Sequence, residues 1–427
     1  MSALGSVKRW KLASVIGASG FAGVAGVSQS LEKASPVPST PLVVAAASPY
    51  PGARHYVSRN IKSLPGGGKL YVYDVKGRTL EYPVPPKGFH PLAASAEQLA
   101  EYGFPPRPTD PAALAEWKST WSAYRTTPVP DLWTVPPGHG IGGQPMQRAS
   151  SGGITSSGGV GVTVEPIPSG AQYTSNWSGY YAVPPYGATR YPFDFVQGTF
   201  MQPAGTSGLS CPGAEEAQWA GLGGMNGSPL IQAGTNMDAT THPNSKTTTY
   251  TYTAWYEFLL GNGNYLNGKP SQETVFGNLK VHASDSMQIT VQYQKSSKSA
   301  FFAVIDQSDG QAQSLDVPNM APYFAGNTAE FVSERPLGPK GYYPPLANFG
   351  SATWLSPLIA YWKNNSTPMV GHYLPHYKNN VPLVMTQNGG PPNVGPTNPN
   401  LVLAVPGQVS GNSASSLFTD YFGAACQ

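Results

Sequence analysis

The stretch Met287-Gln288-Ile289-Thr290-Val291-Gln292-Tyr293-Gln294 alternates apolar and polar residues without exception. Successive side chains of a β-strand point to opposite faces, so this pattern predicts a strand with one buried and one solvated face. Other short strand-like segments follow one another from about residue 173 onward, with turns rather than helical patterns between them. We therefore expect an all-β fold, with a β-sandwich of two antiparallel sheets as the best fit.

The composition agrees with short strands joined by many turns. Only 11% of the 427 residues are charged, whereas glycine (49) and proline (44) are abundant. A chain of long helices would instead be rich in alanine, glutamate, lysine and leucine. Since few carboxylates have to stay ionised for the fold to hold, we also expect it to tolerate acid.

The N-terminal part predicts an exported precursor. Residues 1–30 combine a basic start with an apolar run and predict a secretory signal peptide, hence a secreted, extracellular protein. Residues 31–170 contain linkers rich in proline, glycine and serine and two short helical patterns, and we interpret them as a small mixed or helical pro-region. Residues 171–427 form the β-sandwich domain. No later segment has the ~18 apolar residues needed to cross a bilayer, so no membrane contact is expected after signal removal.

Charges and cysteines add two expectations. The first 170 residues carry 15 basic and 9 acidic residues, whereas the remainder carries 10 basic and 13 acidic residues. The two parts should attract each other near neutral pH, and protonation of carboxylates should weaken this attraction. In an exported protein Cys211 and Cys426 could form one disulfide that ties the C-terminus to a loop; two unpaired thiols are the alternative.

Several common sites are missing from the sequence. It has no pair of Asp-Thr/Ser-Gly motifs, no G-x-S-x-G nucleophile motif, no H-E-x-x-H zinc motif and no phosphate-binding loop. It also has no basic and aromatic patch suited to nucleic acid. We therefore expect no metal, no cofactor and no nucleic-acid partner.

Two polar residues instead stand inside apolar, strand-like runs: Gln232 in Leu230–Gly234 and Glu330 in Asn327–Glu334. If both runs belong to one sheet, the two side chains could point into one cleft. Glu330 could then take a proton from water and later give it to a leaving amine, while Gln232 donates an N–H to the developing oxyanion. A carboxylate as the sole base favours work at acidic pH. The alternative is that both are buried structural groups, a paired carboxyl and a sheet-face amide.

Six short motifs occur in an order that resembles the glutamic peptidases, the eqolisin family or peptidase family G1. They are residues 176–179 (NWSG), 219–224 (WAGLGG), 230–234 (LIQAG), 254–257 (AWYE), 327–331 (NTAEF) and 349–350 (FG). Residues 90–108 are similar to the pro-regions of bacterial members. The resemblance implies a concanavalin-like sandwich and a secreted, acid-active endopeptidase made as a preproenzyme. It also implies polypeptide substrates, an inhibitory pro-region and a monomeric enzyme.

The resemblance assigns roles to four residues. It implies that Glu330 and Gln232 are catalytic and that Trp219 and Glu257 line the substrate cleft, although Glu257 could be a structural acceptor instead. At two places this sequence departs from well-known fungal members, which have aspartates where Gly223 and Asn236 stand here.

Two other functions stay open. One is a non-catalytic carbohydrate-binding or surface module that keeps the sandwich. The other is a glycosidase that uses Glu330 and Glu257 as a carboxylate pair and would not need Gln232.

Overall fold

The computed structural model describes most of the chain. The residues described are 53–75, 77–105, 107, 111–134, 167–185, 191–205, 213–242, 247–261, 273–336, 343–362, 369–392, 400–407, 409 and 413–418. The expected signal peptide and both Cys211 and Cys426 lie outside these residues. So does most of the linker of residues 128–170, rich in proline, glycine and serine, which we call the connector. Within them, no helix is long and apolar enough to cross a membrane.

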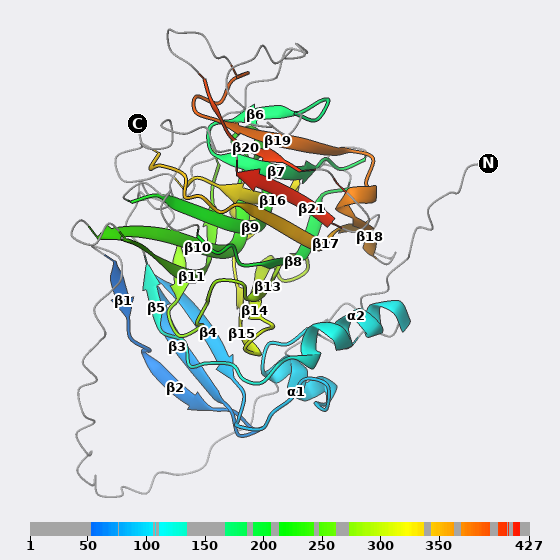
Figure 1. The fold of residues 1–427 in the computed structure, drawn as a ribbon. Helices are drawn as coiled ribbons and strands as arrows, with labels where there is room; N and C mark the ends of the chain where they lie inside the picture. The colour runs from blue at the N-terminus through cyan, green and yellow to red at the C-terminus, as the bar shows by residue number, and fades with distance from the viewer. Residues whose placement is uncertain are drawn as a thin grey trace, which may run out of the picture.

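A mainly antiparallel sheet, which we call the site sheet, carries both predicted catalytic residues. Figure 1 labels most of its strands. Its strands in spatial order are β1 (Arg54–Tyr56), β5 (Leu132–Thr134), β12 (Thr274–Phe276), β11 (Thr247–Leu259), β10 (Leu230–His242), β9 (Glu215–Gly223), β16 (Ala329–Glu334), β7 (Trp177–Ala182) and β19 (Asn380–Thr386). Strand β19 also pairs with β6 (Gln172–Thr174), in parallel, and with β20 (Val402–Pro406).

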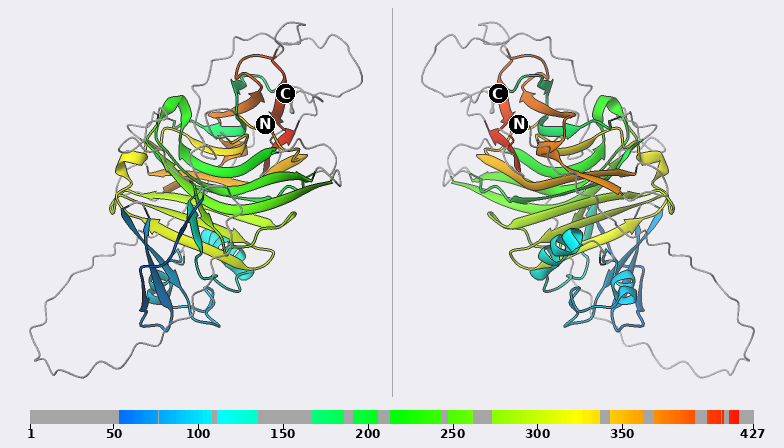
Figure 2. Two further views of the ribbon diagram at one scale, coloured as in Figure 1. Left: turned by 90° about the vertical axis from the view of Figure 1, so that its left-hand side faces the viewer. Right: turned by 90° about the vertical axis from the view of Figure 1, so that its right-hand side faces the viewer.

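A second antiparallel sheet packs against the first, and Figure 2 shows the two as curved layers. Its order is β15 (Gln311–Val317), β14 (Ser299–Asp306), β13 (Ser286–Gln294), β8 (Phe193–Met201) and β17 (Ser351–Trp362), with β18 (Met369–Tyr373) and β21 (Ser413–Phe418) paired to β17. Since β21 also pairs with β20, the two sheets are joined at this end. The predicted β-sandwich is confirmed.

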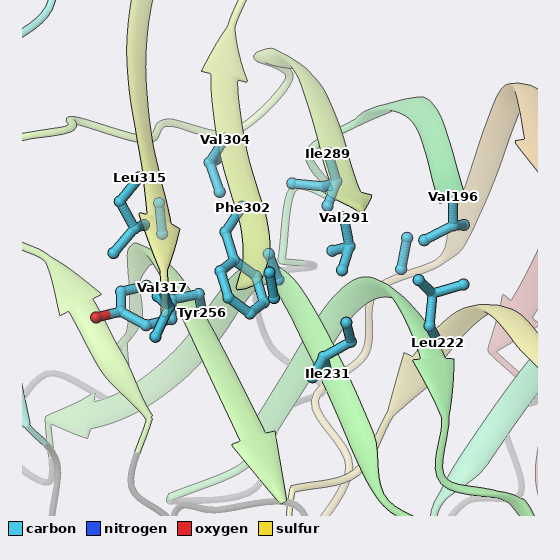
Figure 3. Close-up of a cluster of buried hydrophobic side chains, with 14 of the residues drawn as sticks. Val196, Leu222, Ile231, Tyr256, Ile289, Val291, Phe302, Val304, Leu315 and Val317 are labelled. Atoms are coloured by element: carbon cyan, nitrogen blue, oxygen red, sulfur yellow. The ribbon is translucent and has the colours of Figure 1, made fainter. Parts of the chain in front are cut away.

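The core lies between the sheets and explains which way the site residues face. Figure 3 shows its labelled side chains, which come from both sheets: Val196, Leu222, Ile231, Tyr256, Ile289, Val291, Phe302, Val304, Leu315 and Val317. On β10, Ile231 and Ala233 belong to this core. Because side chains alternate along a strand, Gln232 between them points to the opposite face of the site sheet.

The strand predicted at Met287–Gln294 is β13, and its apolar residues face the core as expected. Its polar face is more covered than the alternation predicts, because the N-terminal region packs there. Gln288 is 5% exposed, and its Nε2 donates to the Thr120 hydroxyl across 3.4 Å.

The N-terminal region contains the two predicted helices and also strands of its own. Helix α1 (Ala96–Glu101) begins with a capping box of Ser95 and Gln98, and α2 is Pro111–Ser122. A separate small sheet consists of β2 (Asn60–Ser63), β3 (Lys69–Val75) and β4 (Arg78–Val84). Single-turn 3-10 helices occur later in the chain: η1 (Met225–Gly227), η2 (Ala321–Tyr323) and η4 (Leu374–His376).

This region shares the hydrophobic core of the sandwich. Tyr82 of β4 is buried, and its hydroxyl lies 3.1 Å from that of Tyr256 on β11. Leu132 of β5 is fully buried in the same cluster as Phe276 of β12. Residues 53–134 thus extend the site sheet through β5 and β1 and pack on the second sheet through the helices, where Trp121 shares a cluster with Ile305.

Candidate active site

Gln232 and Glu330 lie in one cross-strand row of the site sheet. Gln232 pairs with Gly221 on one side, and Glu330 pairs with Gly221 on the other. Residues directly opposite in a sheet project to the same face, so both side chains share the face turned away from the core. Two strand spacings separate their backbones by about 10 Å. We call this surface the dyad face.

Glu330 is a fully buried carboxyl group. Burial raises its pKa well above the ordinary value, while the Thr328 hydroxyl and the Gly223 amide lower it in part. Neither group is aligned for a well-formed hydrogen bond, and within the described residues both carboxyl oxygens lack a partner. In this form burial therefore favours the protonated carboxyl of Glu330.

Gln232 is also fully buried, and its amide has a defined orientation. Its Nε2 donates to Oε2 of Glu257, on the neighbouring strand β11, across 3.0 Å. Within the described residues, its carbonyl oxygen has no hydrogen-bond partner. A carboxylate only accepts, so the amide nitrogen must face Glu257, and the carbonyl is left free for another donor.

Trp219 lies one step along the dyad face from the same row. It pairs with Gly234 on one side and Val332 on the other. Its indole leans over Gly221: a Cβ built on that glycine would lie 3.0 Å from Trp219 Cζ3 and 3.1 Å from Gln232 Cβ. The indole edge is therefore placed between the two predicted catalytic residues.

The structure brings Glu330, Gln232, Trp219 and Glu257 together on the dyad face, whereas Cys211 and Cys426 lie outside the described residues. Three further buried polar residues on or beside this face escaped prediction: Glu334, Asn176 and Glu273. Glu334 stands four residues after Glu330 on the same strand, and this even spacing places both on one face. That signal was available in the sequence, whereas the contacts of Asn176 and Glu273 depend on segments far apart in the chain.

The two departures from the fungal pattern have structural explanations. Asn236 Nδ2 donates to both carboxyl oxygens of Glu273, across 3.0 and 3.1 Å, so a carboxyl group from another segment stands beside this position. Burial, followed by the charge of Glu257, raises the pKa of Glu273. Gly223 has a φ of +99°, and a Cβ there would collide with the carbonyl oxygen of Pro229. An aspartate at 223 would be strained in this turn.

The geometry disfavours the glycosidase alternative. Glu330 and Glu257 belong to the same row, but β9 and β10 lie between their strands, so their backbones are three strand spacings, about 14 Å, apart. Glycosidase carboxyl pairs flank one bond at roughly 5 to 9.5 Å. In addition, Gln232 donates a hydrogen bond to Glu257 from the side on which a glycosidic bond would have to lie.

Metal ligands do not cluster in the part of the chain that the structure describes: no three histidine, cysteine, aspartate or glutamate side chains are arranged to hold an ion.

Comparison with known proteins identifies the family. The model of the Peptidase A4 family matches residues 175–386, which include Gln232, Glu330, Trp219 and Glu257. No curated protein matches the chain. Among solved structures, the chain is similar to scytalido-glutamic peptidase with a transition-state analogue inhibitor, at 18% identity and a TM-score of 0.40, over 57% of this chain and 98% of that one. It is also similar to SCP-B, described as a member of the eqolisin family in complex with the tripeptide Ala-Ile-His, at 18% identity and a TM-score of 0.38, with the same coverage. The match to the family model confirms the resemblance seen in the sequence: the chain belongs to the Peptidase A4 family, the eqolisins or glutamic peptidases, and is a hydrolase of that family.

Proposed function

We propose that this protein is a secreted, acid-active endopeptidase in which Glu330 and Gln232 form the catalytic dyad. The observation that carries the proposal is the shared pairing of both residues with Gly221. This pairing sets a carboxyl and a carboxamide on either side of a position that has no side chain. Once the site opens, a water molecule and a peptide carbonyl group could be held above this position.

The chemistry divides between the two side chains. In the ionised form, Glu330 takes a proton from water as the water attacks the carbonyl carbon, and it later returns that proton to the leaving amine. The amide nitrogen of Gln232 has two N–H groups, of which one is bound to Glu257. The second can donate to the oxyanion, and the free carbonyl can accept from the attacking water.

The described form supports a latent precursor rather than a working enzyme. Burial favours the neutral form of Glu330 here, and a neutral carboxyl cannot act as the base. Once the site opens to water and substrate, the burial that raises its pKa is relieved. The pKa would then return toward the ordinary value of a glutamate, which fits action in acid.

The N-terminal region is the proposed inhibitor. Trp133 of β5 belongs to the apolar cluster of the dyad face, together with Trp219 and Trp255. Asp131 accepts from the Trp133 indole across 3.2 Å and pairs with His55 at 2.5 Å. We propose that acid weakens the attraction between the basic N-terminal part and the acidic remainder and so loosens β1 and β5, and that self-cleavage in the connector before residue 170 completes activation.

Hydrolysis of a denatured protein between pH 2 and 7 tests the proposal. Wild type, Glu330→Gln and Gln232→Ala are compared after acid incubation, and mass spectrometry identifies the new N-terminus. We expect activity confined to acid and lost in both variants, by 10²-fold or more for Gln232→Ala. Full activity in Glu330→Gln would refute the dyad. A mature N-terminus far from the connector would refute the proposed processing.

A further inference from the structure

Glu334 is a buried carboxyl group that the dyad chemistry does not use. It ends β16, lies on the dyad face and is fully buried. Its Oε2 accepts from Nε1 of Trp219 across 2.6 Å, and its Oε1 accepts from Nδ2 of Asn176 across 2.8 Å. Four residues of strand separate it from Glu330, about 13 Å of backbone. It is therefore too far away to exchange protons with a substrate held at Gly221.

The Trp219 indole connects Glu334 to the dyad. Its nitrogen is held by Glu334, while its Cζ3 edge lies over Gly221, between Gln232 and Glu330. Trp177 packs against it edge to face, with ring centroids 5.0 Å apart and an interplanar angle of 76°. Rotation of the indole away from Glu334 would thus move the edge that borders the catalytic gap.

The donors around Glu334 explain why a carboxylate stands there. Two N–H groups, from Trp219 and Asn176, point at its two oxygens. A carboxylate accepts both, whereas an amide offers one oxygen and one NH₂ group. Glutamine would therefore turn its NH₂ group toward a buried donor and leave one N–H without an acceptor.

We infer that Glu334 is a positioning residue, which fixes the Trp219 indole so that its edge maintains the spacing between Gln232 and Glu330. This inference rests on the proposed dyad. Asn176 contributes to the same positioning, because it donates a hydrogen bond to the other oxygen of the Glu334 carboxyl group.

The test exchanges donor and acceptor. Glu334→Gln should lower kcat by roughly 10- to 100-fold, since a displacement of about 1 Å near the reacting atoms has effects of this size. In Glu334→Gln/Asn176→Asp, the new amide can donate to the new carboxylate while its oxygen accepts from Trp219. We expect this double variant to recover at least ten-fold in kcat over Glu334→Gln, with KM changing less than kcat in both.

A second comparison separates positioning from general destabilisation. Trp219→Phe lacks the N–H group, so Glu334→Gln added to it should cause little further loss of kcat. Thermal unfolding at the assay pH shows what fraction of each variant is folded. If Glu334→Gln is as active per folded molecule as wild type, or if the two losses multiply in the combined variant, the inference is overturned. Failure of the double variant to recover activity overturns it as well.

Tryptophan fluorescence tests the contact independently of the dyad. The difference in emission between each protein and its Trp219→Phe counterpart reports the surroundings of this indole. We expect the difference spectrum to change in Glu334→Gln and to return in the double variant, whether or not Glu330→Gln abolishes hydrolysis. An unchanged difference spectrum in Glu334→Gln would refute the indole contact, whereas a fully active Glu330→Gln would refute the dyad instead.

Discussion

Gln232 and Glu330 face each other across a single strand, because both pair with Gly221 from opposite sides. The separation of their backbones is therefore fixed by strand pairing and does not depend on loop conformation, whereas their side chains depend on their own contacts. Gly221 has no side chain, and the Trp219 indole edge and the Gln232 Cβ closely border the place that a side chain would take.

Adding a methyl group at the centre of the row should reduce catalysis more than stability. In Gly221→Ala the new Cβ would lie 3.0 Å from Trp219 Cζ3 and 3.1 Å from Gln232 Cβ, closer than ordinary contact. We expect kcat to fall at least ten-fold, with a loss of unfolding free energy of about 1–3 kcal/mol from overpacking. Acid proteolysis and thermal unfolding measure the two effects. Gly350→Ala is the control, because Gly350 has a φ of +63° and no atom within 4 Å of an added Cβ. Wild-type activity in Gly221→Ala would contradict the prediction that catalysis needs a position without a side chain between Gln232 and Glu330.

Stability should be highest in acid, which reverses the usual behaviour of carboxylates. Burial raises the pKa values of Glu216, Glu330 and Glu334 in the folded protein. Each of these groups binds a proton more tightly when folded than when unfolded. Its stabilising contribution is complete below the unfolded pKa, about 4.5, and is lost as the pH rises toward the folded value.

Thermal unfolding from pH 3 to 8 tests this expectation, with a melting temperature that falls as the pH rises above about 4.5. Glu216→Gln should make the profile flatter, because it removes one group with a raised pKa. The substitution keeps the local hydrogen bond, since Gln218 can still donate to the new amide oxygen. The exposed Glu81 on β4 offers a control, since Glu81→Gln should leave the profile unchanged. A melting temperature that increases steadily toward neutral pH would contradict the prediction.

Loss of the acceptor beside Gln232 should impair catalysis through orientation. Glu257→Leu removes the oxygen that accepts from Gln232 Nε2, so the amide loses its defined orientation. We expect kcat to fall roughly 10- to 100-fold, because the oxyanion donor is then displaced. Steady-state kinetics on a fluorogenic peptide at acidic pH give kcat and KM. Glu257→Gln is the control, because its amide oxygen can still accept from Gln232, and an equal loss in both variants would show that only the lost charge matters.

Cleavage of the connector alone should not separate the N-terminal region from the sandwich at neutral pH. Tyr82 and Leu132 are buried in the core of the sandwich, and β5 pairs with β12. We expect both fragments to elute together in size-exclusion chromatography at pH 7 and to separate on a denaturing gel. Leu132→Asp, which buries a charge, should release the N-terminal fragment, whereas Tyr82→Phe should retain it. Separate elution of the wild-type fragments would refute a shared core.

The alternation of side chains made much of this fold predictable. The pattern in Met287–Gln294 and the isolated polar residues Gln232 and Glu330 were sufficient to place strands and faces. They did not give the register of the strand pairing. It is this register that pairs both catalytic candidates with Gly221. The partners of Glu334 and Asn236 likewise depend on strands distant in the sequence, so no local pattern indicates them.

The N-terminal strands were harder to predict. Strands β1 and β5 have three residues each, too few for a recognisable period, and they join the site sheet only through β12. The covered outer face of β13 was missed for a related reason. Its polar alternation is that of a solvated strand, and only the packed N-terminal region shows why Gln288 is buried.

The pairing of Trp133 with Val275 also sets the order in which the molecule can be completed. Strand β5 is synthesised early, but its partner β12 follows only after β7 to β11 have been made. Contacts between such distant segments form late and slowly during folding. Strand β5 therefore cannot pair at the edge of the site sheet until most of the sandwich has been synthesised. In a newly synthesised chain this edge is unpaired until β12 is present.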